Sequence, residues 1–277
     1  MIVSILDSDL YKFSQQQFVL ELFPDAKVTY KFKNRGPQRF NQKFLENLKK
    51  AVEDMEMLFL TNEEFLWLKK ACPYFKPMYL EYLKNYKFDP SEVKIELDSE
   101  NNLQIMIDGL WHSTILWEVP LLAMISEIYF KTIETDWFTT RKEVDEIQKR
   151  QAANKAFRLE DWKVKYIEFG TRRRRSFHIQ DEVVGEFKKI ATEQTVSSFL
   201  GTSNVYLAMK YDLAPKGTFA HESISAMAIL ESINHANRYM MKNWQKVYNG
   251  QLGIALTDTY GTDAFLNDFD YGLASAY

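Results

Sequence analysis

The chain has 277 residues, of which 46% are hydrophobic, so it is long and apolar enough to bury one large core or two modest ones. This composition excludes a disordered chain and favours a globular enzyme. The formal net charge is only −3, so no strong overall field steers the molecule to nucleic acid or to an acidic membrane, and any anion site must be local.

We expect neither an export signal nor a membrane anchor. The single cysteine, Cys72, cannot form an intramolecular disulfide, which fits a reducing, cytoplasmic setting. The first residues meet Asp7 and Asp9 before any long apolar run, unlike a signal peptide. No stretch reaches the roughly 18 consecutive apolar residues of a membrane-spanning helix. The longest candidate, Thr114 to Ile125, is predicted to be a buried strand that runs into a helix.

Hydrophobic periodicity predicts a helix-plus-sheet domain over residues 1–110. Apolar residues recur at helical spacing over residues 7–22, with Asp7 or Asp9 as the N-cap. They alternate with polar residues from Ala26 to Arg35, as in an amphipathic strand. The remaining predicted elements are three helical segments between Asn41 and Leu83, one of them starting near Thr61, and a hairpin of Val93–Leu97 and Leu103–Ile107.

The second half, residues 111–277, has the pattern of a parallel α/β unit. A long polar helix is predicted from about Thr139 to Phe157. The short strand candidates that follow, each leading into a helix, are Lys165 to Phe169, Val196 to Leu200, Gly217 to Ala220, and Gly253 to Thr257. In barrels of this kind the loops after the strand C-termini carry the chemistry, so we expect the functional residues there.

The first such loop, Phe169 to Ser176, contains four consecutive arginines. Because four successive residues cannot all lie on one side of an element, at least one or two should project toward the concave face of the loop. Guanidinium groups suit bidentate capture of phosphate or carboxylate, and Phe169 offers a surface for stacking. On spacing alone, an anion site and a solvated basic turn explain the run equally well.

Small and polar residues end the next predicted strand, in the run Ser198 to Asn204. Backbone N–H groups and hydroxyls at Gly201, Thr202 and Ser203 are candidates for contact with an anionic ligand. An ordinary turn with Ser203 as the helix N-cap explains the run better when it is taken alone.

His221 directly follows the third predicted strand, and Glu222 begins the next helix. A lone histidine is more often structural than catalytic, but this one is expected at the same end of the parallel unit as the arginine loop. The other histidines lack such a position and are assigned to structure. No pair of histidines has metal-ligand spacing.

Asp258 ends the fourth predicted strand, next to Thr257. An acid there can hold ribose hydroxyls or a hydrated Mg²⁺, which is usually bound through one or two carboxylates plus substrate phosphates. The alternative is helix capping, which explains the nearby Asp263 well and Asp258 less well.

Taken in this order, the motifs resemble the nicotinate phosphoribosyltransferase family. The opening run Leu6 to Lys12 and the run Phe32 to Arg35 are similar to its N-terminal signature, and Trp111 to Glu127 is also similar to that family. The resemblance spans the whole chain. It implies an α/β fold, in which an α+β N-terminal domain is followed by an α/β barrel of the type II phosphoribosyltransferase kind.

The resemblance also implies an activity. Nicotinate and 5-phosphoribosyl 1-pyrophosphate would give nicotinate mononucleotide and pyrophosphate, with Mg²⁺ required and ATP hydrolysis coupled, as the first step of NAD salvage from nicotinate. A homodimer with a shared active site is implied as well, without a nucleic-acid or membrane partner.

Roles for individual residues follow from the same resemblance. Tyr11 and Phe169 would sandwich the pyridine ring, with Tyr11 coming either from a second subunit or from the same chain, which the sequence does not decide. The other implied contacts are Arg172 with the ring carboxylate or the phosphates, Arg35 with the pyrophosphate, His221 as phosphate acceptor and Asp258 beside the phosphoribosyl group. Further substrate-binding candidates are Thr171, Arg173, Gly201, Thr202, Ser203 and Thr257. Of the four arginines we expect Arg172 to touch substrate and Arg173 to Arg175 to be partly solvated.

One departure from the family concerns the barrel. The family pattern continues past Phe269 into further strands and a Gly-rich loop for the 5′-phosphate, whereas this sequence ends at Tyr277. Four or so strands cannot close a barrel that normally needs eight or nearly so. We therefore expect an incomplete barrel and no turnover from this fragment alone.

Two other interpretations stay open. A nicotinamide phosphoribosyltransferase would be favoured by an acid near position 203; the chain has Ser203 there, and the run Arg172 to Arg175 favours a carboxylate ligand. A non-catalytic anion-binding fragment would leave Phe169, His221 and Asp258 scattered rather than gathered at one pocket.

Overall fold

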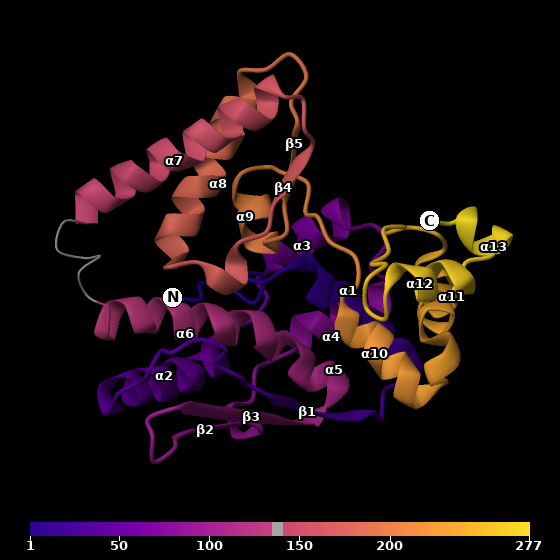
Figure 1. Ribbon diagram of the computed structural model, residues 1–277, viewed down its shortest axis with the longest axis horizontal. Helices are drawn as coiled ribbons and strands as arrows, with labels where there is room; N and C mark the ends of the chain where they lie inside the picture. Colours follow the sequence, from indigo (N-terminus) through magenta and orange to yellow (C-terminus); the bar gives the residue numbers. More distant parts are fainter. Residues whose placement is uncertain (135–140) are drawn as a thin grey trace.

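The computed structural model describes residues 1–134 and 141–277, and its first half is a small sheet covered by helices (Figure 1). The sheet has the order β1-β3-β2, and both neighbours of β3 run antiparallel to it. The strands span Lys27–Lys31 (β1), Val93–Leu97 (β2) and Leu103–Leu110 (β3). Ile95 pairs with Ile105 on the buried face, as alternation of apolar and polar residues requires. The predicted strand and hairpin are confirmed.

The helices predicted for this half are also present. They are α1 (Leu10–Leu22), α2 (Gln42–Asp54), α3 (Asn62–Ala71) and α4 (Pro77–Asn85), with 3-10 turns at Met55–Met57 and Pro90–Glu92. Helix α2 packs against β2 and against α6 (Glu118–Thr132). Helix α3 begins at a capping box, in which the side chains of Thr61 and Glu64 each bond the other's backbone N–H.

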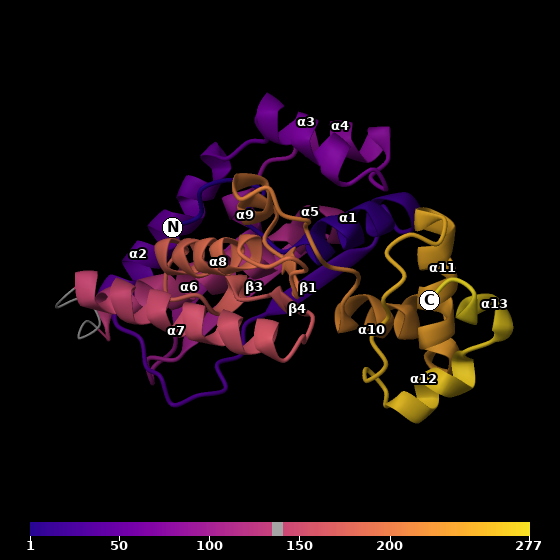
Figure 2. The same ribbon diagram turned by 90° about the horizontal axis from the view of Figure 1, so that it is seen from above.

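Helix α1 crosses the middle of the molecule between the α3–α4 pair and the C-terminal helices (Figure 2), and it is buried on every side from Leu10 to Val19. Its buried polar side chains have partners in distant parts of the chain, as buried polar groups require. The Gln15 side chain donates to the Ser223 hydroxyl, and that of Gln16 donates to the His112 carbonyl. The Gln17 side chain accepts from the Lys76 N–H. Periodicity predicted this helix but not the burial of its polar face.

The stretch Thr114 to Ile125, predicted as a strand running into a helix, is helical throughout. Helix α5 (Trp111–Thr114), a 3-10 turn (Ile115–Trp117) and α6 follow one another without a break. The strand prediction is wrong because a strand must pair its N–H and C=O groups with neighbours, whereas a helix satisfies them internally within a core. The run Trp111–Thr132 is apolar and long enough to cross a membrane. However, 67% of its most apolar stretch is buried inside the protein, as in a core helix.

Helices α7 (Arg141–Asp161) and α8 (Phe177–Thr192) pack side by side and run in the same direction (Figure 1), as the pairs Asp145–His178 and Lys149–Glu182 show. They enclose a small apolar cluster of their own, built around Ala156, Phe187 and Phe199. The predicted long polar helix is therefore present, although its predicted start at Thr139 lies outside the described residues.

Two of the four predicted parallel strands form. Strands β4 (Tyr166–Glu168) and β5 (Phe199–Thr202) pair in parallel, with β5 shifted toward the C-terminus from the predicted Val196 to Leu200. The predictions for residues 217–220 and 253–257 are wrong, because neither segment has a strand ladder.

Of the two segments that lack a ladder, the first contacts β5 and the second contacts the first. The Lys216 N–H donates to the Thr202 carbonyl at 2.9 Å. Thr218 Oγ1 lies 3.1 Å from the Leu252 carbonyl oxygen and 2.6 Å from that of Ile254. A side-chain hydroxyl thus links the two segments where backbone bonds were expected.

The main hydrophobic core draws on both halves of the chain. The last helices are α9 (Val205–Lys210), α10 (His221–Leu230), α11 (Ala236–Tyr248), α12 (Thr262–Asp268) and α13 (Tyr271–Ala274), with a 3-10 turn at Ile233–His235. Trp244 of α11 packs on Phe18 of α1, with ring centroids 5.6 Å apart, and both belong to the same buried cluster. The domain boundary near residue 110 stays a prediction, since the core is continuous across it.

Candidate active site

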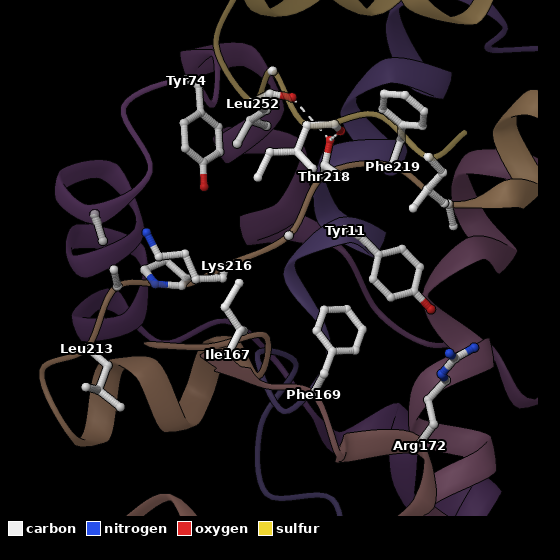
Figure 3. A pocket seen from close by; sticks show the side chains of 18 of the residues that line it. Tyr11, Tyr74, Ile167, Phe169, Arg172, Leu213, Lys216, Thr218, Phe219 and Leu252 are labelled. Atoms are coloured by element: carbon white, nitrogen blue, oxygen red, sulfur yellow. Dashed lines mark hydrogen bonds between the residues drawn. The ribbon is translucent and has the colours of Figure 1, made fainter. Parts of the chain in front are cut away.

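A cavity of about 980 Å³ opens where three helices begin, next to the end of β4 (Figure 3). Tyr11 is the second residue of α1, Glu118 is the first of α6 and His221 is the first of α10, and all three line the cavity. The N-termini of α1 and α10 follow extended residues, and their partial positive charge favours an anionic ligand, whereas α6 continues the helical run that begins at Trp111.

Two aromatic rings face each other at one end of the cavity. The rings of Tyr11 and Phe169 are nearly parallel, with an interplanar angle of 14° and centroids 6.1 Å apart. Tyr11 is 5% exposed and Phe169 is 50% exposed, so one ring is fixed in the core and the other is open to the cavity. Burial raises the pKa of Tyr11 further above its ordinary value, so the hydroxyl stays protonated in alkaline solution as well as at neutral pH.

A guanidinium group lies at the edge of this ring pair. Figure 3 shows Arg172 beside the hydroxyl end of Tyr11. Arg172 comes from a 3-10 turn, Thr171–Arg173, and its Nη1 donates to Glu118 Oε1 at 3.0 Å. Burial by itself would raise the pKa of Glu118, but the charges of Lys12 and Arg172 outweigh it and lower that pKa. The ring pair and the cation together suit a flat ring that carries an acidic group.

A buried lysine lies behind the ring pair. Lys12 Nζ is 2.5 Å from Glu118 Oε2 and 2.5 Å from Glu222 Oε2, and its side chain is fully buried. Burial alone would lower the pKa of Lys12; the two carboxylates outweigh it and hold that pKa well above its ordinary value. The other oxygen of Glu222 accepts from Tyr30 Oη at 2.5 Å and from Trp111 Nε1 at 2.7 Å.

His221 and Asp258 meet at the rim of the cavity. His221 Nε2 is 3.7 Å from Asp258 Oδ1, and His221 Nδ1 is 2.8 Å from Thr259 Oγ1. Both side chains are more than half exposed, so a ligand can reach them. The structure thus brings His221 and Asp258 together at the cavity that contains Phe169, although His221 follows an irregular segment rather than the predicted strand.

Four predicted substrate contacts lie in the wall behind Phe169 and not on the cavity surface. The bonds of their side chains are internal: Thr202 donates to Glu168 at 2.6 Å, Ser203 donates to Asp9 at 2.7 Å, and Thr171 accepts from Gln180 at 3.1 Å and Asn204 at 3.3 Å. At Gly201, with φ +130°, a Cβ would meet the Ala214 carbonyl oxygen at 2.1 Å. The N-cap of α9 is Asn204 rather than Ser203, and Asp9 precedes α1 without capping it through its side chain.

Three other predicted contacts are exposed and do not line the cavity: Arg35, Arg173 and Thr257. The expectation of a solvated side chain is right for Arg173 and wrong for Arg174, which is 5% exposed. Arg174 Nη1 and Nη2 donate to the two oxygens of Asp7 at 2.6 and 2.8 Å. Its role is to fix the loop to the N-terminal segment.

Comparison with known proteins supplies the family. The model of the nicotinate phosphoribosyltransferase N-terminal domain matches residues 6–126, and that of the nicotinate phosphoribosyltransferase family matches residues 164–277. The chain belongs to the nicotinate phosphoribosyltransferase family.

Relatives from distant organisms agree with this assignment. A nicotinate phosphoribosyltransferase of Methanosarcina mazei is 48% identical over all of this chain, which covers 70% of that protein. A probable nicotinate phosphoribosyltransferase of Schizosaccharomyces pombe is 42% identical over 97% of the chain, which covers 65% of that protein.

Solved structures of the family have the same fold. A putative nicotinate phosphoribosyltransferase from Saccharomyces cerevisiae superposes with a TM-score of 0.92 at 39% identity, and one from Porphyromonas gingivalis with a TM-score of 0.90 at 36% identity. The superpositions cover 100% and 99% of this chain and 68% of each of those proteins.

Within this nicotinate phosphoribosyltransferase fold, the residues that sequence reasoning missed are the charged ones around Lys12. Glu118 and Glu222 lie in the first turns of α6 and α10, where acidic residues are common for electrostatic reasons alone. Nothing in the sequence indicates that a lysine from α1 lies between them, because the three residues are far apart in the chain. The ring pair is also formed within one chain, while a contribution of Tyr11 to the site of a second subunit stays a prediction.

Proposed function

We propose that this protein binds nicotinate and transfers a phosphoribosyl group to it from 5-phosphoribosyl 1-pyrophosphate, which gives nicotinate mononucleotide and pyrophosphate. The observation that carries the proposal is the parallel pair of Tyr11 and Phe169 with Arg172 at its edge. A pyridine ring inserted between two rings needs about 7 Å, two contact distances of about 3.5 Å. Because the observed centroid distance is only 6.1 Å, Phe169, the exposed partner, has to move outward slightly to admit the ring.

Arg172 is proposed to bind the ring carboxylate. Its contact with Glu118 uses Nη1, so the guanidinium fork is not enclosed by a bidentate protein partner. A second carboxylate at the fork gains charge-assisted hydrogen bonds, which fits an acid better than an amide.

The proposed reaction forms a bond from the pyridine nitrogen to the anomeric carbon of the ribose, while the bond from that carbon to the pyrophosphate oxygen breaks. The pyrophosphate leaves with the electron pair, and the transition state resembles an oxocarbenium ion. Nicotinate is already ionised and its nitrogen carries a lone pair, so no protein base is required. The protein contributes by holding nucleophile and electrophile in line and by stabilising the departing anion.

His221 is proposed to accept a phosphoryl group from ATP, which would couple ATP hydrolysis to the reaction. In the tautomer in which Nδ1 donates to Thr259, Nε2 keeps the lone pair that forms a bond to the γ-phosphorus as the bond to ADP breaks. The exposed position of His221 at the cavity rim leaves room for a nucleotide.

Asp258 is the proposed protein ligand for Mg²⁺. The described residues contain no group of three or more histidine, cysteine, aspartate or glutamate side chains that could hold a metal ion by themselves. One exposed carboxylate beside His221 nevertheless fits Mg²⁺, which prefers to share carboxylate and substrate phosphate oxygens. When bound, the ion would neutralise charge on the pyrophosphate.

The homodimeric state, the cytoplasmic location and the division at residue 110 belong to the same proposal. We also propose that residues 1–277 alone give no turnover, because the matched relatives are longer and the chain covers 70% of the Methanosarcina mazei protein.

The test is product formation by the full-length protein. We expect nicotinate mononucleotide and pyrophosphate from nicotinate and 5-phosphoribosyl 1-pyrophosphate, with a higher yield when ATP is added, and loss of that stimulation in His221→Ala. Phe169→Leu should raise the KM for nicotinate about tenfold or more through loss of stacking, which is worth about 1–3 kcal/mol for a base on an aromatic side chain. Equal or faster product formation from nicotinamide would contradict the proposal and favour the amide-specific enzyme.

A further inference from the structure

We propose that Lys12, which is buried behind the cavity, is a positioning residue that keeps Arg172 available for the nicotinate carboxylate. The inference deepens the proposed function and rests on it. Lys12 occupies one oxygen of Glu118, and Arg172 occupies the other.

The argument starts from the sharing of Glu118. Lys12 Nζ is 2.5 Å from Oε2, whereas Arg172 Nη1 is 3.0 Å from Oε1. A carboxylate with both oxygens free engages an arginine in two parallel hydrogen bonds and closes its fork. Because Lys12 holds Oε2, Glu118 orients Arg172 through one contact, and the guanidinium group lies beside the hydroxyl end of Tyr11 (Figure 3).

The second step is the balance of charge. Lys12 and Arg172 contribute two positive charges, and Glu118 and Glu222 contribute two negative ones, so the connected group is neutral. Lys12 is fully buried and Glu118 is 26% exposed, so solvent screens these charges weakly. Loss of the lysine charge would leave one surplus negative charge next to the site where an anion has to bind.

Glu222 has partners that hold it in place without Lys12. Tyr30 Oη and Trp111 Nε1 both donate to its Oε1. Neutral glutamine at this position keeps a carbonyl oxygen as acceptor for these donors, and its NH2 group replaces the oxygen that Lys12 contacts. The charge of Glu222 can therefore be removed with its shape retained, which provides the matched variant.

The charge argument predicts an order of nicotinate affinities that a packing role for Lys12 would not give. Lys12→Met, which makes the group net negative, should weaken nicotinate binding about tenfold or more, as expected for one unscreened charge several Å away. Glu222→Gln, which makes it net positive, should leave nicotinate binding unchanged or tighten it. The double variant Lys12→Met/Glu222→Gln restores neutrality and should return the Kd to within about threefold of the wild type.

The measurement is calorimetric titration of the full-length protein with nicotinate and with nicotinamide, which has the same ring without the charge. We expect the affinity for nicotinamide to change less than that for nicotinate in every variant. Binding is preferred to turnover as the readout, because Glu222 adjoins His221 and its substitution can alter the step with ATP.

Each outcome decides between the alternatives. A double variant that binds nicotinate more weakly than Lys12→Met overturns the inference, since purely structural damage accumulates. If Lys12→Met does not fold, Glu222→Gln and the double variant still test the predicted order of nicotinate affinities. Weaker nicotinate binding by Glu222→Gln than by the wild type would then overturn the inference about Lys12. If the wild-type protein does not bind nicotinate, it is the proposed function that has failed.

Discussion

At the scale of single residues, Asp9 shows how burial in the wall of the site changes the chemistry of a side chain. It is fully buried, Ser203 donates to its Oδ1 at 2.7 Å, and its Oδ2 has no hydrogen-bond partner among the described residues. Burial raises the pKa of Asp9 from 3.8 to about 6. The folded protein therefore favours the protonated carboxyl more strongly than the unfolded chain does.

This shift predicts how Asp9→Asn changes stability with pH. Protonation of Asp9 stabilises the fold fully below about pH 4, and that stability is lost as pH rises through about 6, so at pH 8 the buried charge opposes folding by up to about 3 kcal/mol. Asparagine keeps an acceptor for Ser203 and cannot ionise. We expect Asp9→Asn to be more stable than the wild type by about 1–3 kcal/mol at pH 8 and equal to it at pH 4, in urea unfolding.

Asp98 is a suitable control because its pKa is shifted in the opposite direction to that of Asp9. Hydrogen bonds from Asn102 lower the pKa of Asp98, so its contribution to stability is present at neutral pH and is lost on acidification. Asp98→Asn should therefore be less stable than the wild type at pH 8. An Asp9→Asn protein that loses stability at pH 8 would show that burial of the charge is not the controlling effect.

At the scale of elements, helix α9 is capped by Asn204, whose side chain also donates hydrogen bonds to buried residues. Asn204 Oδ1 accepts from the Leu207 N–H at 2.9 Å, while its Nδ2 donates to Asp7 at 2.9 Å and to Thr171 at 3.3 Å. Asn41 caps α2 in the same way, through the Phe44 N–H at 2.8 Å, but it lies on the surface.

The two caps predict different costs for the same substitution. Asn41→Ala removes an exposed cap and should lower the free energy of unfolding by about 1 kcal/mol. Asn204→Ala also removes one buried donor to Asp7 and one to Thr171, although Arg174 and Gln180 still donate to these groups, so we expect a further loss of about 1 kcal/mol or more. Chemical denaturation of both variants tests the difference, and equal losses would mean that the bonds of Asn204 to the interior contribute nothing.

Local patterns predicted most of the elements because the signals lie within a few residues. The capping box at Thr61 and the alternation in the β2–β3 hairpin are of this kind. The strands predicted at residues 217–220 and 253–257 did not form, since a parallel ladder depends on neighbours that no local pattern specifies. The hydrogen bonds of Thr218 with the carbonyl oxygens of Leu252 and Ile254 nevertheless hold the two segments side by side.

At the scale of the whole molecule, the ion pair of Asp7 and Arg174 joins segments 167 residues apart in the sequence. Both side chains are almost completely buried. Removing one partner of a buried pair leaves an uncompensated charge, which costs about 3–5 kcal/mol. The neighbouring Arg173 is exposed and offers a control with the same chemistry.

We therefore expect Arg174→Met to lower the free energy of unfolding by about 3–5 kcal/mol and Arg173→Met to change it by less than about 0.5 kcal/mol. Guanidinium unfolding followed by tryptophan fluorescence measures both. Similar effects of the two substitutions would mean that the loop is not fixed by Arg174.

The functional site was predictable only in part, because some of its contacts join segments that are far apart in the sequence. Phe169 and Arg172 follow the end of strand β4, as expected, whereas His221 and Asp258 follow segments that form no strand. Phe169, Arg172 and His221 line one cavity, and Asp258 lies 3.7 Å from His221 at its rim. The arrangement of Lys12 with Glu118 and Glu222 depends on three helices meeting, which no local pattern describes. The hydroxyls of Thr202 and Ser203 looked like ligand contacts in the sequence, but their nearest partners are the carboxylates of Glu168 and Asp9.

The burial of polar residues in helix α1 has a consequence for how this protein can vary. Most helices at the surface accept almost any polar residue on their outer face, but Gln15, Gln16 and Gln17 each bond to a different segment of the chain. No substitution keeps both the length and the paired donor and acceptor of an amide. Saturation mutagenesis of this helix should find its glutamines less tolerant of replacement than the apolar residues of α2. For the same reason, these polar positions should change more slowly in evolution than the apolar ones.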